Sequence, residues 1–81
     1  MVYQTKGTCS RAIEFDLDED KKIRSLRFIG GCSGNTQGIG ALVEGMDAEE
    51  AIRRLENIRC GARPTSCPDQ LAKALKQALG L

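Results

Sequence analysis

Hydrophobic and polar residues alternate along the segment 12–18, near the start of the chain. Ile13, Phe15 and Leu17 occupy every second position, and acidic residues separate them. An alternation with a period of two is typical of a strand that buries one face. The charged segment 18–22 follows directly and predicts a solvated hairpin turn at the end of this strand.

A related pattern appears in the segment 23–29. Leu26 and Phe28 fall on one face of the expected strand, and Arg24 departs from that face. The short segment 2–6 predicts a further strand at the beginning of the chain. Together the three segments predict a three-stranded antiparallel meander.

After the third strand the spacing of apolar residues becomes helical. The first helix is expected to begin at a cap on Asn35 or Thr36 and to end at Gly45. Asp47 is a good N-cap for a second helix, with Glu50 in the capping-box position. The apolar stripes are expected to comprise Ile39, Leu42 and Val43 in the first helix, and Ala51, Ile52, Leu55 and Ile58 in the second.

A third helix is predicted after the turn-rich segment 61–65. Pro68 suits its first position, Cys67 lies at or beside its N-cap, and Gly80 stops it. Its expected stripe comprises Leu71, Ala72, Leu75, Ala78 and Leu79. Three strands followed by three helices indicate an α+β fold, in which the helices pack on one face of a small sheet. Residues 1–81 are expected to form a single domain.

The composition narrows the classes of function. The 81 residues are 41% hydrophobic and 4% aromatic, which predicts a small aliphatic core. Domains of this size often add a metal or disulfides to such a core. The chain has twelve Lys and Arg residues and eleven Asp and Glu residues, which gives a net charge of +1. This balance provides no overall field that would attract nucleic acid, so nucleic-acid binding is not expected.

The segment at the start of the chain has no apolar leader region, and no stretch approaches the ~20 apolar residues that span a bilayer. We therefore expect a cytoplasmic protein that does not associate with membranes. Thiols stay reduced in the cytoplasm, and stable disulfides are rare there. For the four cysteines of this chain, that environment favours metal binding or redox chemistry over a disulfide framework.

Each cysteine lies where an expected element begins or ends. If the hairpin turns near residues 19–20, position i faces position 40 minus i, which brings Cys9 beside Cys32. The next two helices have about ten residues each, or roughly 15 Å at 1.5 Å per residue, and they would carry the chain away and return Cys60. A six-residue loop keeps Cys67 close. The topology therefore predicts that the four thiols meet at one end of the sheet.

Four thiolates suit a closed tetrahedral zinc site or an iron–sulfur centre. Arg11, Arg59 and Arg63 are close in sequence to three of the cysteines and would offset their negative charge. The spacing C-x22-C-x27-C-x6-C contains no C-x-x-C pair and does not select one metal. Two alternatives stay open: Cys60 and Cys67 form a redox dithiol, or the cysteines only pack within a metal-free interaction module.

The remaining sequence features give weaker indications of a binding or catalytic function. The glycine-rich segment 30–40 lacks the Gly-Lys-Ser/Thr ending of a phosphate-binding loop, and we interpret it as a tight turn into a helix. Gly38 and Gly40 cost roughly 1 kcal/mol each in a helix relative to Ala, which predicts a close approach of another group. With no histidine, a Cys–His nucleophile cannot form. No catalytic residue is assigned to the chain.

The string Thr-Ser-Cys-Pro-Asp at 65–69 resembles the signature of the TSCPD domain family. The segments CSGNTQGI, from Cys32, and RCGARPTSCPDQLA, from Arg59, extend the likeness along most of the chain. Such domains occur as small four-cysteine bacterial proteins and at the C-terminal end of vitamin B12-dependent ribonucleotide reductases. The resemblance implies an accessory role in ribonucleotide reduction, and so in DNA synthesis, with a ribonucleotide reductase or another redox protein as partner, or a metal or redox function detached from it. A chain of 81 residues cannot itself be the reductase.

A weaker resemblance is to the NifU-like iron–sulfur scaffold domains, whose elements follow a similar order. Cys9, Cys32 and Cys67 would match the scaffold cysteines, and Cys60 would be additional. The scaffold has an Asp two residues after its first cysteine, where this chain has Arg11. It has a His before its last cysteine, where this chain has Ser66. These departures disfavour transient cluster assembly, but they are compatible with a closed four-thiolate site.

Overall fold

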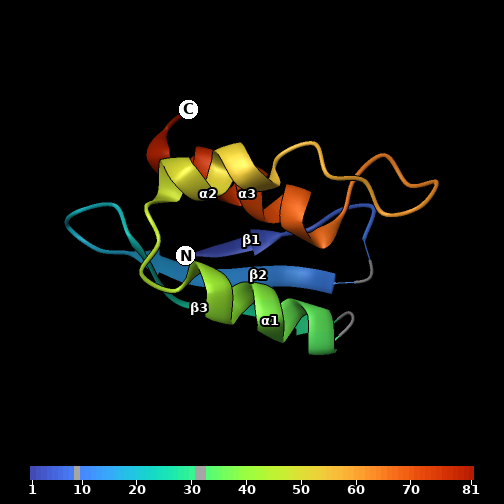
Figure 1. Cartoon of the computed structure of the whole chain (residues 1–81), viewed down its shortest axis with the longest axis horizontal. Helices are drawn as coiled ribbons and strands as arrows, with labels where there is room; N and C mark the ends of the chain where they lie inside the picture. The colour runs from blue at the N-terminus through green and yellow to red at the C-terminus, as the bar shows by residue number, and fades with distance from the viewer. Residues whose placement is uncertain (9, 31–32) are drawn as a thin grey trace.

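The computed structural model describes residues 1–8, 10–30 and 33–81. Its elements are β1 (Val2–Gln4), β2 (Ser10–Leu17), β3 (Ile23–Gly30), α1 (Ser33–Val43), α2 (Ala48–Leu55) and α3 (Cys67–Leu79). The strands form one antiparallel sheet in the order β1-β2-β3. Figure 1 shows α1 lying along β3 and α2 lying beside α3. The predicted α+β fold, a three-stranded meander followed by three helices, is confirmed.

The register of the β2–β3 hairpin follows the predicted rule at both ends of the ladder, and it is shifted by one residue between two irregularities in the middle. Ser10 faces Gly30 at one end of the ladder and Leu17 faces Ile23 at the other, so the numbers of the paired residues add to 40 in both cases. The turn between the strands is closed by the amide of Asp18, which donates to a backbone oxygen four residues on. The ladder therefore ends beside Ser10 and Gly30, at the end of the sheet opposite the hairpin turn.

A β-bulge explains why Arg24 departs from the inward face of β3. The register shifts here so that Ser25 and Leu26 together lie opposite Phe15, and Ser25 has a positive φ of 56°. An extra residue in a strand reverses which face the following side chains occupy. Ile23 and Leu26 can therefore both contact the core although they are three positions apart.

The apolar core is one cluster to which the sheet and all three helices contribute. Ile13 and Phe15 are two positions apart on β2, so their side chains share a face. They pack with Val43 of α1, Ile52 of α2 and Leu71 of α3. Burying an aliphatic or Phe side chain of this kind stabilises a protein by about 1.5–3 kcal/mol. Since all three helices join this cluster, they cover the same face of the sheet, as predicted.

The apolar stripe of α1 differs from the prediction. Val43 is buried as expected, but Leu42 is 77% exposed. The helix instead turns Gly40 toward β3, where an added Cβ would lie 3.3 Å from the carbonyl oxygen of Leu26. The close approach predicted from Gly40 is therefore present, and it rotates Leu42 out to the surface.

The second helix is shorter than predicted. It ends at Leu55, and the left-handed residue Asn57 then turns the chain away, with a φ of 68°. Ile58 is 41% exposed and does not belong to the helix. The prediction that Cys60 closes this helix is therefore wrong, and Cys60 lies in the loop 56–66 instead.

The helix starts also shift slightly from their predicted positions. The helix α1 begins at Ser33, before the caps expected at Asn35 or Thr36. The N-cap of α3 is Ser66, so Cys67 is the first helical residue. The inward face of α3 is formed by buried Leu71, Ala72, Ala74 and Leu75, whereas Ala78 is exposed. Among the described residues, no helix is long and apolar enough to cross a membrane.

Candidate functional site

A pocket of about 370 Å³ opens between the first half of α1, the loop 56–66 and the first turn of α3. It is lined by Asn35, Thr36 and Ile39 from α1, by Ile58, Arg59 and Cys60 from the loop, and by Ser66, Cys67 and Pro68 from the start of α3. Two of the four predicted thiols therefore belong to one pocket, although different elements carry them.

The two described cysteines are both free thiols. Cys60 is exposed and Cys67 is half-buried. The predicted ligands Cys9 and Cys32 lie outside the described residues. Within the described ranges, no group of three or more Cys, Asp or Glu side chains is arranged to hold a metal ion.

The residues next to the other two cysteines in sequence belong to the same end of the sheet. Ser10, which follows Cys9 in the chain, places its Oγ 3.2 Å from the Sγ of Cys67. Ser10 also pairs with Gly30 across the β2–β3 ladder. The helix that begins at Ser33, directly after Cys32 in the sequence, lines the pocket with its first turns. The residues that follow Cys9 and Cys32 in the sequence thus lie in the same region of the fold as Cys60 and Cys67.

The three arginines predicted to offset thiolate charge are all exposed, and they take different positions. Arg59 lines the pocket. The backbone amide of Arg63 donates to the carbonyl oxygen of Cys60 at 3.0 Å, which closes the turn that carries this cysteine. Arg11 is the extra residue of a β-bulge in β2, next to the pair that Ser10 forms with Gly30. Of these three arginines, only Arg59 is among the lining residues.

A buried carboxylate beside the pocket is a feature that the sequence analysis missed. The side chain of Asp69 in α3 is only 5% exposed. It accepts hydrogen bonds from the backbone amide of Asn57 at 2.6 Å and from the hydroxyl of Thr65. Lys73, one turn further along α3, lies 3.4 Å away. These contacts tie the loop that carries Cys60 to the first turn of the helix that carries Cys67.

The surroundings of Asp69 act on its pKa in opposite directions. Burial raises the pKa of Asp69 because it disfavours the charged form. The hydrogen bonds from Thr65 and Asn57, together with the positive charge of Lys73, outweigh burial and hold the pKa below its ordinary value of 3.8. Asp69 is therefore an anion at neutral pH, and its role in this position is to accept hydrogen bonds.

Ser66 and Gln70 complete the polar network. The hydroxyl of Ser66 donates to the carbonyl oxygen of Ile58 at 2.6 Å and accepts from the amide of Asp69. The side-chain oxygen of Gln70 accepts from the amide of Lys6 at 3.0 Å, 64 positions away. The spacing of Ser66 and Asp69 is that of a capping box, which is the signal in the sequence that would have identified the N-cap.

The electrostatics of the pocket favour negative charge. Asn35 and Thr36 lie in the first turns of α1, and Cys67 and Pro68 lie in the first turn of α3. The N-terminal ends of two helices therefore meet at one pocket, and each carries a partial positive charge. Arg59, a cationic residue, is also in the lining, so the pocket favours anionic groups such as thiolates.

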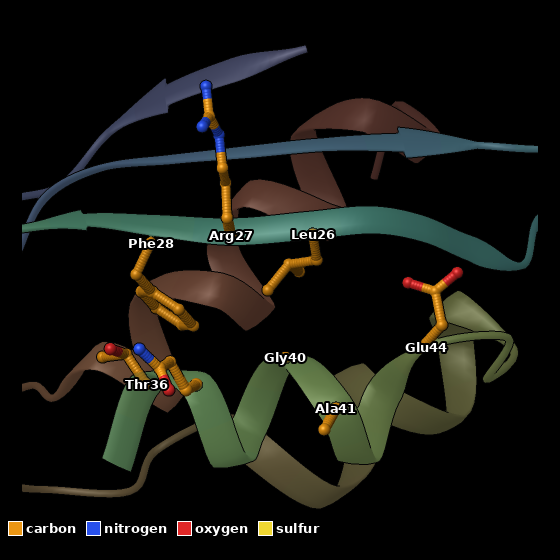
Figure 2. A pocket seen from close by; sticks show the side chains of 8 residues that line it. Leu26, Arg27, Phe28, Thr36, Gly40, Ala41 and Glu44 are labelled. Carbon is orange, nitrogen blue, oxygen red and sulfur yellow. The ribbon is translucent and has the colours of Figure 1, made fainter. Parts of the chain in front are cut away.

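A second pocket, of about 450 Å³, lies between β3 and α1. Figure 2 shows Leu26 and Phe28 pointing from β3 toward the helix, while Arg27 points away across the sheet. Glu44 lines its far end and accepts a hydrogen bond from the amide of Ser25 at 3.0 Å. This pocket is larger, but its lining contains no cysteine and no pair of acidic groups. The thiol-lined pocket is therefore the candidate site.

Comparison with known proteins identifies one family. Residues 1–79 match the family model described as the TSCPD domain. No curated protein and no solved structure gives a significant match. The family match includes the string 65–69, in which Thr65, Ser66 and Asp69 form the polar network beside the pocket.

Proposed function

The chain belongs to the TSCPD domain family, and we propose that it is a small cytoplasmic module that binds zinc or an iron–sulfur centre through Cys9, Cys32, Cys60 and Cys67. Its biological role is that of an accessory to ribonucleotide reduction, with a ribonucleotide reductase or another redox protein as partner. Any catalytic activity would belong to the ribonucleotide reductase system that the module serves.

One observation carries the metal proposal. Cys60 and Cys67 line a common pocket although a loop separates them. The contact of Ser10 with Cys67, and the first turns of α1 in the same lining, place the described neighbours of the remaining two cysteines at this pocket. Consecutive Cα atoms are 3.8 Å apart, so a neighbour in sequence restricts where a cysteine can lie. This arrangement supports a single four-thiolate site.

The charge of such a site fits the pocket. Four thiolates around one Zn²⁺ leave a net charge of −2, which a closed structural site must accommodate. Two helix N-termini and the cationic residue Arg59 supply positive potential at the pocket. When bound, zinc would supply a rigid cross-link, whereas an iron–sulfur centre would supply electron transfer.

The first test is the metal content of protein purified without oxygen, measured together with its visible spectrum and its number of free thiols. About one zinc per chain, or iron with sulfide absorbance, together with protected thiols would support the proposal. Four freely reactive thiols and no metal would contradict it.

A variant sharpens this test at the most exposed candidate ligand. We expect Cys60→Ser to lower the metal content and the unfolding temperature, because a closed site loses one of four ligands. Ala62→Ser is the matched control, since it changes an exposed residue of the same loop and removes no thiol. Equal metal content in the two variants would remove Cys60 from the site.

A second candidate function is thiol–disulfide exchange, and the shared pocket of two free thiols favours it. One thiolate would attack a partner's disulfide, form a mixed disulfide and release the partner's other sulfur as a thiolate. The second thiolate would then attack the mixed disulfide, which releases the partner in its reduced form. The partner gains two electrons, and Cys60 and Cys67 become a disulfide.

A redox titration of the metal-free protein separates the two functions. The exchange function requires a reversible two-electron couple that Cys60→Ser abolishes. A protein that shows neither this couple nor bound metal would be left as an interaction module in which the cysteines only pack.

A further inference from the structure

The chain is nearly neutral as a whole, with a net charge of +1, but its charges are unevenly distributed between the two ends of the molecule. Negative charge gathers at the hairpin end, which comprises the turn between β2 and β3, the last residues of β2, the connection between α1 and α2, and the first turn of α2 (Figure 1). The acidic residues of this end are Asp16, Asp18, Glu19, Asp20, Glu44, Asp47, Glu49 and Glu50. Most carboxylates of the chain therefore lie at the end opposite the cysteine pocket.

The cysteine end, beside the pocket of Cys60 and Cys67, carries positive charge instead. Its exposed cationic residues share one property: none of them forms an ion pair with another residue that the structure describes. This set, which we call the cationic surface, comprises Lys6, Arg11, Arg59 and Arg63. In contrast, each arginine outside this set pairs with a carboxylate. The cationic surface therefore keeps its donors available for another molecule.

Printed contacts hold the members of the cationic surface at the same end. The amide of Lys6 donates to the side-chain oxygen of Gln70, early in α3, at 3.0 Å. An added Cβ on the last residue of β3 would lie 3.4 Å from the Nε of Arg11, so this guanidinium lies over that end of the sheet. Arg59 lines the cysteine pocket, and Arg63 follows it in the same loop. Figure 1 shows the segment 5–8 and the loop 56–66 at this end of the molecule.

The acidic residues nearest the cationic surface are already paired. Glu56, at the start of the loop, accepts a hydrogen bond from Lys76 at 2.6 Å. Asp69 is buried, and it lies 3.4 Å from Lys73. Neither carboxylate is available to neutralise the exposed cations, so the cysteine end is a surface of net positive charge.

We propose that the cationic surface is a docking site for an acidic protein segment. A protein with opposite charges at its two ends is oriented by the field of its partner, so that one end arrives first and association is faster. Arg59 lines the same pocket as Cys60 and Cys67, so an acidic segment bound here would bring its protein against the thiols. The inference deepens the proposed function by naming the chemistry of the partner's surface, and it rests on that function only for the existence of a partner.

An acidic protein segment fits this surface better than a nucleic acid does. Proteins that bind single strands use aromatic side chains on which the bases stack. The aromatic residues of this chain are Tyr3, Phe15 and Phe28, and all of them pack in or against the apolar core. The cationic surface therefore offers charge without a stacking platform, which suits carboxylates.

The test is the affinity of the protein for a fluorescein-labelled oligo-glutamate peptide, measured by fluorescence anisotropy in roughly 50 mM and roughly 200 mM salt. We expect saturable binding that weakens at the higher salt concentration, because counterions screen exposed charges. The double variant Arg59→Gln with Arg63→Gln should bind the peptide about fivefold more weakly at the lower salt concentration, as the loss of two exposed ion pairs implies.

The matched control is the double variant Lys21→Gln with Lys22→Gln. It removes the same amount of positive charge from the hairpin end, from residues that also form no ion pair with another described residue. We expect the control to bind the peptide as the original protein does. Equal weakening in the two double variants, or no peptide binding by the original protein, would overturn the inference.

Two further measurements decide between an acidic protein segment and other occupants. A labelled oligo-deoxythymidine with the net charge of the peptide should bind more weakly than the peptide, and equal or tighter binding would overturn the inference in favour of a nucleic acid. Sedimentation should show a monomer. Self-association that the Arg59→Gln with Arg63→Gln variant abolishes would assign the cationic surface to the acidic end of a second copy, and it would overturn the inference as well.

The metal content of each sample separates this inference from the proposed function. Peptide binding by protein that holds no metal after purification without oxygen would support the inference, although the metal proposal fails. A protein that holds zinc or iron but does not bind the peptide would overturn the inference and leave the metal site in place.

Discussion

Asp18 and Asp69 support opposite ends of the molecule in different ways. Asp18 closes the hairpin turn: its side chain accepts from the backbone amides of Asp20 and Lys22, each at 2.9 Å, and pairs with Arg24. These partners all lie within six positions of it. Its side chain is 31% exposed, so water can replace the contacts that a substitution would remove.

Asp69 lies in the first turn of α3, beside the cysteine pocket. Figure 1 shows the start of α3 at the opposite end of the molecule from the turn between β2 and β3. The side chain of Asp69 is 5% exposed, and it holds the amide of Asn57, twelve positions away, as well as the hydroxyl of Thr65. The hairpin end is thus closed by local contacts, whereas the cysteine end depends on a buried side chain that joins a long loop to a helix. The comparison shows that the TSCPD string has two roles at the cysteine end. It contains one of the thiols, and its polar side chains hold the loop that carries another.

The largest effect is expected from Asp69→Ala. The substitution leaves the amide of Asn57 and the hydroxyl of Thr65 without their buried acceptor, and each such loss costs about 1–3 kcal/mol. We expect the free energy of unfolding to fall by about 3 kcal/mol, measured by urea denaturation. Asp18→Ala is the matched control and should cost clearly less. Equal losses in the two variants would remove the distinction between the two ends.

The pH dependence of stability should report the same carboxylate. The folded protein holds the pKa of Asp69 below 3.8, so the unfolded chain takes up a proton first as the pH falls. The carboxylate therefore contributes its full stabilisation above pH 3.8, and this contribution is lost as the pH falls through the lower folded-state value. The difference in unfolding free energy between the original protein and Asp69→Asn should be constant near neutral pH and should shrink in acid. If the difference in unfolding free energy between the two proteins does not change with pH, the loss of stability comes from the geometry of the Asn side chain and not from the missing charge.

Two helix caps extend the comparison at a smaller scale. Ser66 caps α3 at the cysteine end and also donates to the carbonyl oxygen of Ile58. Asp47 caps α2 at the hairpin end through one contact with the amide of Glu50, at 3.3 Å. We expect Ser66→Ala to cost about 1.5–2 kcal/mol and Asp47→Ala about 0.5–1 kcal/mol in urea denaturation. The reverse order would show that the Ser66–Ile58 bond adds nothing.

The smallest effect concerns two glycines of α1. An added Cβ at Gly38 would meet no atom within 4 Å, whereas one at Gly40 would lie 3.3 Å from the carbonyl oxygen of Leu26. We expect Gly38→Ala to stabilise the protein by about 0.5–1 kcal/mol, because alanine favours the helix. Gly40→Ala should gain less or lose stability. Thermal unfolding of the two variants would show whether only the second glycine serves a close approach.

Much of the fold follows from local pattern. The alternation of Ile13 and Phe15 gave the second strand its buried face, and a turn near residues 19–20 was enough to set a register in which Ser10 faces Gly30. The end of α3 at Gly80 follows from its left-handed conformation, with a φ of 76°. The convergence of Cys9 and Cys32 with the other two thiols stays a prediction.

The errors lie where local pattern and tertiary contact compete. Leu42 suits an apolar stripe, but the close approach at Gly40 rotates α1 so that Leu42 faces solvent. Ile58 extends the period of α2, but the chain has already turned at Asn57, whose amide Asp69 binds. A periodic pattern indicates which residues favour burial. It does not indicate where a side chain from a distant part of the sequence will bind the backbone and end a helix.

The sequence alone determined the order of the elements, the register of the hairpin and the membership of the family, since these depend on neighbouring residues and on matched strings. Only the tertiary structure decided that Asp69 anchors the loop of Cys60 and that Ser10 contacts Cys67. The physical reason is the separation of the partners: a hydrogen bond across 57 positions leaves no periodic trace in the chain. It forms because the packed sheet and helices bring two polar groups together where water is excluded.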